Sequence, residues 1–323
     1  MKHVSILIPK GLSSVVNIGG THQMLSWVNE SLVQTGKNAL FTIQTVGLEH
    51  QTQAPGGLFS ISPDVLVAEV AHTDLIIIPA IHGDFEENQA ANSAFVPWLV
   101  RQYKAGAEIV SLCVASFFLA STGLLDGKSC STHWQYANEF RQKFPQARLM
   151  DDKILTEDGG IYTSGGAYSF TNLILYLIEK HAGRDIAVMA AKGFMIDIDR
   201  NSQSPFMVFR GQKTHDDPAV LKAQQYIEHH FQDKITVDAL CSEQAIGRRT
   251  FERRFKRATG NTVAEYIQRV RIEAAKKALE KRHPSVNEVM FDVGYTDAKA
   301  FRDVFKKYAG LSPAGYRTKY AIS

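Results

Sequence analysis

Cysteine is scarce in this sequence, and it contains no long apolar run. The 323 residues include three cysteines, Cys113, Cys130 and Cys241, at unrelated spacings. Such a set predicts neither a disulfide framework nor a metal site, and a reducing cytoplasm is the simplest setting. No apolar run approaches the roughly 20 residues that cross a membrane. The short apolar run before Pro9 does not fit a signal peptide, so we expect no membrane partner. We also expect no cofactor.

Charge is unevenly divided along the chain. The whole sequence carries a net +3. From Pro218 onward, 20 Lys and Arg stand against 12 Asp and Glu, a net +8, whereas the first 217 residues carry 16 against 21, a net −5. A basic C-terminal third beside an acidic body indicates a polyanion-binding module attached to a different domain. With 45% hydrophobic residues, the chain is long enough for two separate cores.

Residues 1–205 alternate short apolar runs with helical patterns. Strands are expected at 4–9, 40–46, 74–79, 108–112, 153–156 and 161–163, and helices at 20–35, 65–71, 95–105, 115–121, 168–181 and 184–194. The run 74–79 is apolar almost throughout, as in a strand that is buried on both faces of a parallel sheet. The alternation predicts an α/β domain with a doubly wound, flavodoxin-like parallel sheet.

Cys113 stands where the strand expected at 108–112 runs directly into a helix. A residue there lies at the C-terminal edge of the sheet, beside a helix N-terminus whose partial positive charge lowers a thiol pKa. Twenty residues later, His133 supplies an imidazole at an expected strand end. We expect Cys113 and His133 to line a ligand pocket together with Ile81 and His82, which follow the strand that ends at Pro79. His133 fits a pocket residue better than a catalytic base.

Residues 206–217 are polar and turn-rich and are expected to link the first domain to an all-α domain at 218–320. Within 246–258, one stripe at helical spacing is apolar (Phe251, Phe255 and Ala258), and a nearly opposite stripe is charged (Arg249, Glu252, Arg253 and Lys256). This is the layout of a recognition helix in a DNA major groove. A solvated basic helix on a globular surface would show the same stripes.

The same pattern recurs 50 residues later. The apolar stripe there is Phe301, Phe305 and Tyr308, and the outer stripe is Lys299, Arg302, Asp303 and Lys306. Ser285 and Glu288 form a capping box ahead of this pair of helices, and Gly260 and Gly310 are expected helix ends. The sequence therefore predicts two helix-turn-helix units, at 238–259 and 286–309, joined by one long helix.

The C-terminal spellings resemble the AraC/XylS family. The matching segments are Phe251-Glu-Arg-Arg-Phe-Lys-Arg-Ala-Thr-Gly260, Val293-Gly-Tyr-Thr-Asp-Ala-Lys-Ala-Phe301 and Phe305-Lys-Lys-Tyr-Ala-Gly-Leu-Ser-Pro313. The resemblance implies that each unit places its second helix in the major groove, in successive turns on one face of the DNA. By position it implies these DNA-binding residues: Arg248, Arg249, Glu252, Arg253, Lys256, Arg257, Lys299, Arg302, Asp303 and Lys306.

Several positions on the two helices carry specific expectations. Arg253 is the best candidate for base recognition, because arginine pairs bidentately with guanine. Lys256, Arg257, Lys306 and Lys307 are expected phosphate contacts, which position the protein without reading sequence. Asp303 departs from the basic or polar residue that is usual in the family. It would accept from cytosine or repel phosphate, so the first unit is expected to supply most of the specificity.

Residues 1 to about 200 resemble the PfpI-like branch of the class I glutamine amidotransferase-like superfamily. The matching pieces are Cys113, Leu119-Ala-Ser-Thr-Gly-Leu-Leu-Asp-Gly127, Thr132-His-Trp134 and Thr163-Ser-Gly-Gly166. Two features of the enzymes are missing. The acidic residue near the cysteine is replaced within Ser13-Ser-Val-Val-Asn-Ile18, and the Gly-Gly after the strand is replaced by Ala80-Ile81. The resemblance therefore implies a fold without a complete catalytic set.

Together the two halves resemble GlxA-type regulators. We expect a DNA-binding transcriptional activator and no enzyme, with promoter DNA, a small-molecule effector, RNA polymerase and a second copy of the chain as partners. Two other interpretations remain open. One is a cysteine hydrolase or hydratase with a DNA-binding tail, and the other treats the first domain purely as a dimerisation scaffold.

Overall fold

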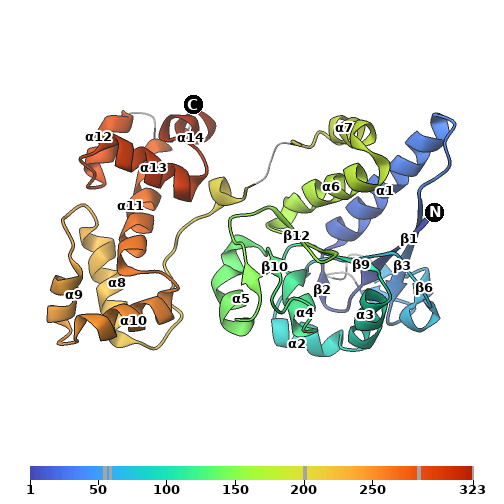
Figure 1. The fold of residues 1–323 in the computed structure, drawn as a ribbon, viewed down its shortest axis with the longest axis horizontal. Coiled ribbons are helices and arrows are strands. Elements are labelled where there is room, and N and C mark those ends of the chain that lie inside the picture. The colour runs from blue at the N-terminus through green and yellow to red at the C-terminus, as the bar shows by residue number, and fades with distance from the viewer. Residues whose placement is uncertain (54–56, 58–59, 199–201, 282–284, 322–323) are drawn as a thin grey trace. The chain divides into compact units, whose positions relative to one another are not determined.

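The chain divides into two compact units in the computed structural model, Met1–Gln203 and Ser204–Ser323. The model describes residues 1–53, 57, 60–198, 202–281 and 285–321 (Figure 1). Within these ranges, no helix is both long and apolar enough to cross a membrane.

A seven-stranded sheet forms the centre of the first unit. Its strand order is β12-β13-β9-β7-β1-β3-β6. The strands are β1 (Lys2–Ile8), β3 (Phe41–Gly47), β6 (Val65–Leu66), β7 (Leu75–Ile78), β9 (Glu108–Ser111), β12 (Leu155–Asp158) and β13 (Ile161–Ser164). Only the β12–β13 pair is antiparallel within this sheet. The predicted doubly wound α/β fold is therefore confirmed.

Short strands pair outside the main sheet and shape its loops. They are β2 (Leu12–Ser13) with β8 (Ile81–His82), β4 (Thr52–Gln53) with β5 (Ser60–Ile61), and β10 (Ser129–Cys130) with β11 (Arg148–Leu149). The β2–β8 pair is antiparallel, with Ser13 opposite Ile81. It fixes the loop that leaves the C-terminal end of β7 beside the N-terminus of the first helix.

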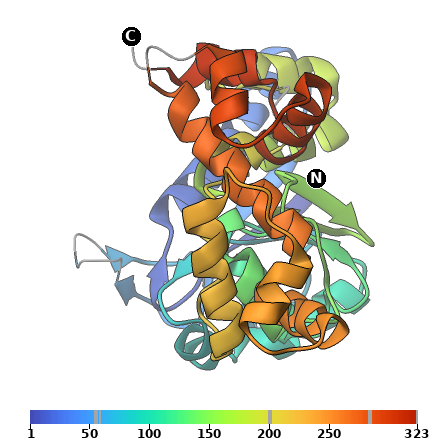
Figure 2. The same cartoon turned by 90° about the vertical axis from the view of Figure 1, so that its left-hand side faces the viewer.

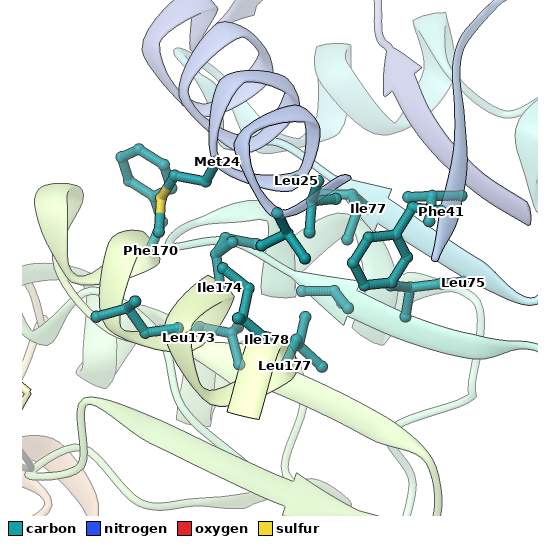
Figure 3. Close-up of a cluster of buried hydrophobic side chains, with 14 of the residues drawn as sticks. Met24, Leu25, Phe41, Leu75, Ile77, Phe170, Leu173, Ile174, Leu177 and Ile178 are labelled. Atoms are coloured by element: carbon teal, nitrogen blue, oxygen red, sulfur yellow. The ribbon is translucent and has the colours of Figure 1, made fainter. Parts of the chain in front are cut away.

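Helices cover both faces of the sheet (Figure 1). One face is covered by α1 (Val15–Gln34), α6 (Phe170–Ala182) and α7 (Arg184–Gly193), and the other by α3 (Phe95–Lys104), α4 (Ala115–Ser121) and α5 (Ala137–Lys143). Figure 3 shows the first core, where side chains of α1 and α6 meet Leu75 and Ile77 of β7. Gly20 permits this approach, because a Cβ there would lie 2.9 Å from the ring of Phe170.

Several element predictions were wrong in detail. The helix predicted at 65–71 is instead β6 followed by a single 3-10 turn, Val67–Glu69, because Val65 pairs with Val46 at the sheet edge. Helix α1 begins five residues earlier than predicted, since Ser14 caps it by accepting from the Asn17 N–H at 3.3 Å. Three helices were not predicted: α2 (Phe85–Ala91), α5, and α14 (Pro313–Tyr320).

The second unit is helical and is built on two small cores. Its helices are α8 (Pro218–His230), α9 (Val237–Glu243), α10 (Arg248–Thr259), α11 (Val263–Leu279), α12 (Val286–Asp292), α13 (Ala298–Ala309) and α14. Helix α11 runs from the α8–α10 group to the α12–α14 group (Figure 1) and contributes side chains to both cores. The predicted capping box at Ser285 and the left-handed helix ends at Gly260 and Gly310 are confirmed. Figure 2 looks onto this unit.

The segment 206–217 does not form a free linker. It belongs to the second compact unit and packs along its helices. The Phe209 ring, for example, lies edge-on against Tyr266 of α11 with 5.1 Å between ring centroids. A polar, turn-rich composition predicted exposure here, but an aromatic side chain every few residues is enough to fix an irregular segment onto a helical surface.

The first core predicts a large difference between two positions on α1. Leu25 is fully buried between α1 and the sheet, whereas Val33 on the same helix is 59% exposed. We expect Leu25→Ala to lower the free energy of unfolding by about 2–5 kcal/mol, because it leaves a cavity in a packed core. Val33→Ala should change it by less than about 0.5 kcal/mol. Urea denaturation followed by circular dichroism measures both, and equal effects would contradict this description of the core.

Candidate functional site

Helix α10 presents two opposite faces. Phe251 and Phe255 are fully buried in the core formed with α8, α9 and α11. The outer face is exposed and carries the six charged residues predicted from this helix: Arg248, Arg249, Glu252, Arg253, Lys256 and Arg257. The structure therefore places all six on one solvent-facing surface.

The exposed cations of α10 differ in their partners. Arg248 is held by its neighbours, since its guanidinium lies 3.2 Å from Asp238 of α9 and 3.2 Å from Glu252 one turn later. Within the described part of the chain, Arg249, Arg253 and Lys256 form no ion pair. The same holds for Arg257, so four predicted DNA contacts of α10 are available to an anion, whereas Arg248 already has two acidic partners.

A groove runs beside the cationic face. It has a volume of about 500 Å³ and is bordered by α10, the first residue of α9 and the first turn of α11. Five of the predicted DNA-binding residues line it: Arg248, Arg249, Glu252, Arg253 and Lys256. Thr262, which lines this edge of the groove, caps α11 in a reciprocal capping box with Glu265.

Helix α13 repeats the design of α10. Phe301 and Phe305 are buried in the second core. Lys299, Arg302, Asp303 and Lys306 are exposed on the outside, as predicted. From the second residue of each helix onward, α13 has the same burial pattern as α10; the first residues differ, since Arg248 is exposed and Ala298 is half-buried. Arg302 donates from Nε to the Ala298 carbonyl at 2.9 Å, so this arginine is held along its own helix.

Cys113 lies at the turn between β9 and α4 with a φ of 58°, in the left-handed region that residues with side chains rarely adopt. Its N–H donates to Ser164 Oγ at 3.1 Å. The side chain is 1% exposed and packs with Ala80, Val114, Phe85 and Tyr136. The predicted position at the sheet edge is therefore correct.

The lowered thiol pKa that the helix end predicted is not found for Cys113. Burial raises the pKa of Cys113 to about 12 and outweighs the opposing hydrogen bond from the Val114 backbone. The sequence argument counted the positive end of the helix but not the loss of water around the sulfur, which disfavours the thiolate more strongly.

Asn17 of α1 occupies the space near the cysteine turn. Its side chain is 3% exposed, and its Oδ1 accepts from the Ala80 N–H at 3.1 Å. Ala80 follows Pro79 at the point where the superfamily's enzymes are expected to offer a backbone donor to an oxyanion. That donor already has a partner here, and a neutral amide does not replace an acidic residue.

His133 caps a short 3-10 turn, Trp134–Tyr136, rather than ending a strand. Its Nδ1 accepts from the Gln135 N–H at 3.1 Å, so the neutral ring carries its proton on Nε2. The pKa of His133 is lowered, first by burial and second by the charge of His82. His133 is therefore a neutral donor through Nε2. Tyr136 contacts the His133 ring and packs against the Cys113 cluster, so the structure brings these two predicted pocket residues close together.

The other predicted pocket positions are divided. His82 is exposed, and Ile81 is buried in the core beneath α3 and α4. Sequence reasoning missed the aromatic neighbours of His133 and Cys113. Tyr136 lies 5.9 Å from the His133 ring and 5.6 Å from Phe85, which stacks on Phe117 at 3.8 Å. The Trp134–Tyr136 segment directly after His133 was the available signal.

Gln203 was also missed, and it connects the loops of this region. Its side chain is 2% exposed. The amide oxygen accepts from the N–H groups of Trp134 and Gly166 at 3.3 and 3.2 Å, and the amide nitrogen donates to three further carbonyls. An isolated glutamine in a polar segment carries no sequence signal for this role, because its partners lie far away in the chain.

Comparisons with known proteins agree with both halves of the fold. Residues 21–180 match the DJ-1/PfpI family, and residues 240–319 match a helix-turn-helix domain. The chain is 25% identical to the HTH-type transcriptional regulator GbdR of Pseudomonas aeruginosa, over 88% of this chain and 77% of that relative. It is 21% identical to the HTH-type transcriptional regulator GlxA of Rhizobium meliloti, over 78% of this chain and 76% of that relative.

A solved structure shows the same fold for part of the chain. An AraC family transcriptional regulator from Pseudomonas putida, 16% identical, superposes with a TM-score of 0.50 and covers 60% of this chain and all of that one. The two resemblances drawn from sequence motifs are confirmed. The chain consists of a DJ-1/PfpI-type domain followed by an AraC-type helix-turn-helix domain, and it is a relative of the HTH-type transcriptional regulators GlxA and GbdR.

Proposed function

We propose that this protein is a sequence-specific transcriptional regulator whose DJ-1/PfpI-type domain senses a small-molecule effector. The observation that carries the proposal is the repeated recognition helix: α10 and α13 bury the same two aromatic positions and expose cations on the opposite face. The names of the relatives support it, since GbdR and GlxA are described as transcriptional regulators. Promoter DNA is the partner that this design fits.

Within the first helix-turn-helix unit, Arg253 and Arg249 are the proposed base readers. They are exposed, lie in the groove and form no ion pair within the described part of the chain, so a guanine edge meets no internal competitor. Arg248 and Glu252 form a pair on the same face and orient each other. Lys256 and Arg257 in the last turn are proposed phosphate contacts.

Within the second helix-turn-helix unit, Lys299 and Arg302 are the proposed base readers and Lys306 is a proposed phosphate contact. Asp303 is exposed between them. Its carboxylate accepts from cytosine N4 or repels the DNA backbone, and in either case it makes the two units unequal. We therefore propose that the first unit carries most of the sequence specificity.

The effector site is proposed at the C-terminal edge of the sheet, around Cys113, His133 and His82, with Ile81 behind them. His133 offers a neutral N–H donor, and Phe85 and Tyr136 offer aromatic surface. These groups suit a small molecule with one acceptor, such as a carboxylate or carbonyl, and an apolar part. Effector binding would regulate transcription by changing how DNA-binding units are presented in a homodimer, with activation through RNA polymerase as the proposed output.

The same geometry argues against an enzyme. A thiol with a pKa of about 12 stays protonated at neutral pH, and the backbone donor at Ala80 is already bonded to Asn17. A cysteine hydrolase needs a thiolate and a free oxyanion donor. We therefore propose that Cys113 contributes surface and shape to the effector site rather than covalent chemistry.

The DNA-reading role predicts different losses of DNA affinity when Arg253 and Lys256, which lie on one face of α10, are replaced. A site is first selected from a random double-stranded pool by the full-length protein. On that site Arg253→Ala should cost about 1–3 kcal/mol and relax the preference at one base pair. Lys256→Ala should weaken selected and random DNA equally and reduce the salt dependence of binding. Equal losses for Arg253→Ala on both DNAs would make it a phosphate contact, and failure to select any sequence would refute the proposed function.

The thiol assignment predicts slow alkylation of Cys113. Burial raises the pKa of this thiol to about 12, so it stays protonated at pH 7. Iodoacetamide should leave Cys113 unmodified in the native protein from pH 7 to 9 and modify it once urea unfolds the chain, as peptide mapping by mass spectrometry would show. Rapid modification at neutral pH, lost in Cys113→Ser, would instead support the enzyme interpretation.

A further inference from the structure

The segment from 204 to 217, which we call the strap, is fixed along its length to the helices of the C-terminal compact unit. It contains only one short 3-10 turn, Ser204–Phe206, before α8 begins at Pro218. Its contacts follow an order: the upstream end touches the second helix-turn-helix unit, the middle touches α11, and the downstream end touches the first helix-turn-helix unit.

The upstream end lies against the end of α13. A Cβ placed on Gly310, which terminates α13 with a φ of 68°, would lie 3.0 Å from Pro205 and 3.1 Å from Ser204. Phe206 then meets α14, where the Lys319 ammonium lies over its ring at 5.2 Å from the centroid. Two consecutive contacts thus attach the strap to the helices that flank the second core.

The middle of the strap is bound by a buried ion pair on α11. Glu273 and Lys276 lie 2.9 Å apart, with side chains 12% and 5% exposed. Lys276 donates to the Met207 carbonyl, and Glu273 accepts from the Phe209 N–H at 3.1 Å. Burying two charges is costly unless their remaining hydrogen-bonding capacity is used. Here it is used on the strap backbone.

Phe209 connects the strap to the first half of α11 and, through Arg269, to α13. Its ring contacts Tyr266, which belongs to the first core. It also lies 5.7 Å from the Arg269 guanidinium, which on its other side lies 4.8 Å from the Tyr308 ring of α13. One aromatic side chain of the strap therefore completes a stack that reaches the second recognition helix.

The downstream end is bound to the first helix-turn-helix unit. The Gln212 carbonyl accepts from Gln224 of α8 at 2.9 Å. Asp217 holds Arg254 of α10 through two hydrogen bonds, of 2.8 and 2.6 Å. Arg254 is on the recognition helix itself, so the strap ends in direct contact with α10.

We propose that the strap fixes the orientation of α10 relative to α13, so that both recognition helices bind one DNA molecule at the same time. The proposal rests on the proposed function. The two helix-turn-helix units are also connected by α11 and by the α8–α9 loop, where the Gln232 carbonyl lies against Gly294. The strap adds a separate connection on the side of α11 that contacts Phe209. Two adjacent major grooves are about 34 Å apart along the DNA. Once one helix-turn-helix unit is bound, free movement of the other lowers its effective concentration at the second groove.

The test compares Phe209→Ala with Val208→Ala in the full-length protein. Val208 is the adjacent strap residue and is 41% exposed, so it serves as a matched control. Affinity is measured on the selected DNA site and on a version with the half-site for α13 scrambled. We expect Phe209→Ala to bind the complete site about tenfold more weakly and the scrambled site within about twofold of the unaltered protein. Val208→Ala should match the unaltered protein on both.

Unchanged binding of Phe209→Ala to the complete site would overturn the proposal. Equal losses of affinity on both DNAs would also overturn it, because they would indicate a defect in the first helix-turn-helix unit alone. An unaltered protein that selects no DNA would refute the proposed function instead. Should Phe209→Ala fail to fold, the double variant Glu273→Gln with Lys276→Met replaces it, since it removes the charge pair together.

A measurement without DNA gives an independent answer. Spin labels at Arg253→Cys and Arg302→Cys report the distance between α10 and α13, and the three native cysteines are buried and shielded from labelling. We expect a narrow distance distribution in the otherwise unaltered chain and in Val208→Ala, and a broad one in Phe209→Ala. The same narrow distribution in all three would overturn the proposal.

Discussion

Burial of two phenylalanines one helical turn apart is the constraint on which the DNA-binding unit depends. Phe251 and Phe255 anchor α10 in one core, and Phe301 and Phe305 anchor α13 in the other. Once these rings are buried, the rotation of each helix about its axis is fixed, and the cations between them must face outward. The exposed charge is therefore a consequence of the packing, which explains why α10 and α13 share one burial pattern from their second residue onward although their outer residues differ.

In the DJ-1/PfpI-type domain the same competition between burial and charge has the opposite outcome. The turn at Cys113 keeps the strained backbone and helix-edge position of a reactive cysteine. The sulfur, however, has almost no contact with water, and the Ala80 N–H already donates to Asn17. These two observations are why we propose that the groups around Cys113 bind an effector rather than catalyse a reaction.

The two compact units are joined in sequence at Gln203 and Ser204. Gln203 is held by backbone groups of the first, and the next fourteen residues are held by α8, α10, α11, α13 and α14 of the second. A segment with so many contacts has little conformational freedom of its own and does not behave as a flexible linker.

Much of this molecule follows from local sequence. The apolar stripes of α10 and α13, the caps at Ser285, Gly260 and Gly310, and the strand–turn–helix at Cys113 all depend on residues close together in the chain, so periodicity and capping chemistry predicted them. The predicted DNA-binding face followed from the same stripes. Tertiary structure alone decided three points. It buried Cys113 and so raised its pKa, it paired Arg248 with Asp238 while giving Arg253 no ion pair among the described residues, and it turned the polar segment 206–217 into a strap held by Glu273 and Lys276. Each of these depends on desolvation or hydrogen bonding between residues distant in sequence, and neither effect leaves a mark on local composition.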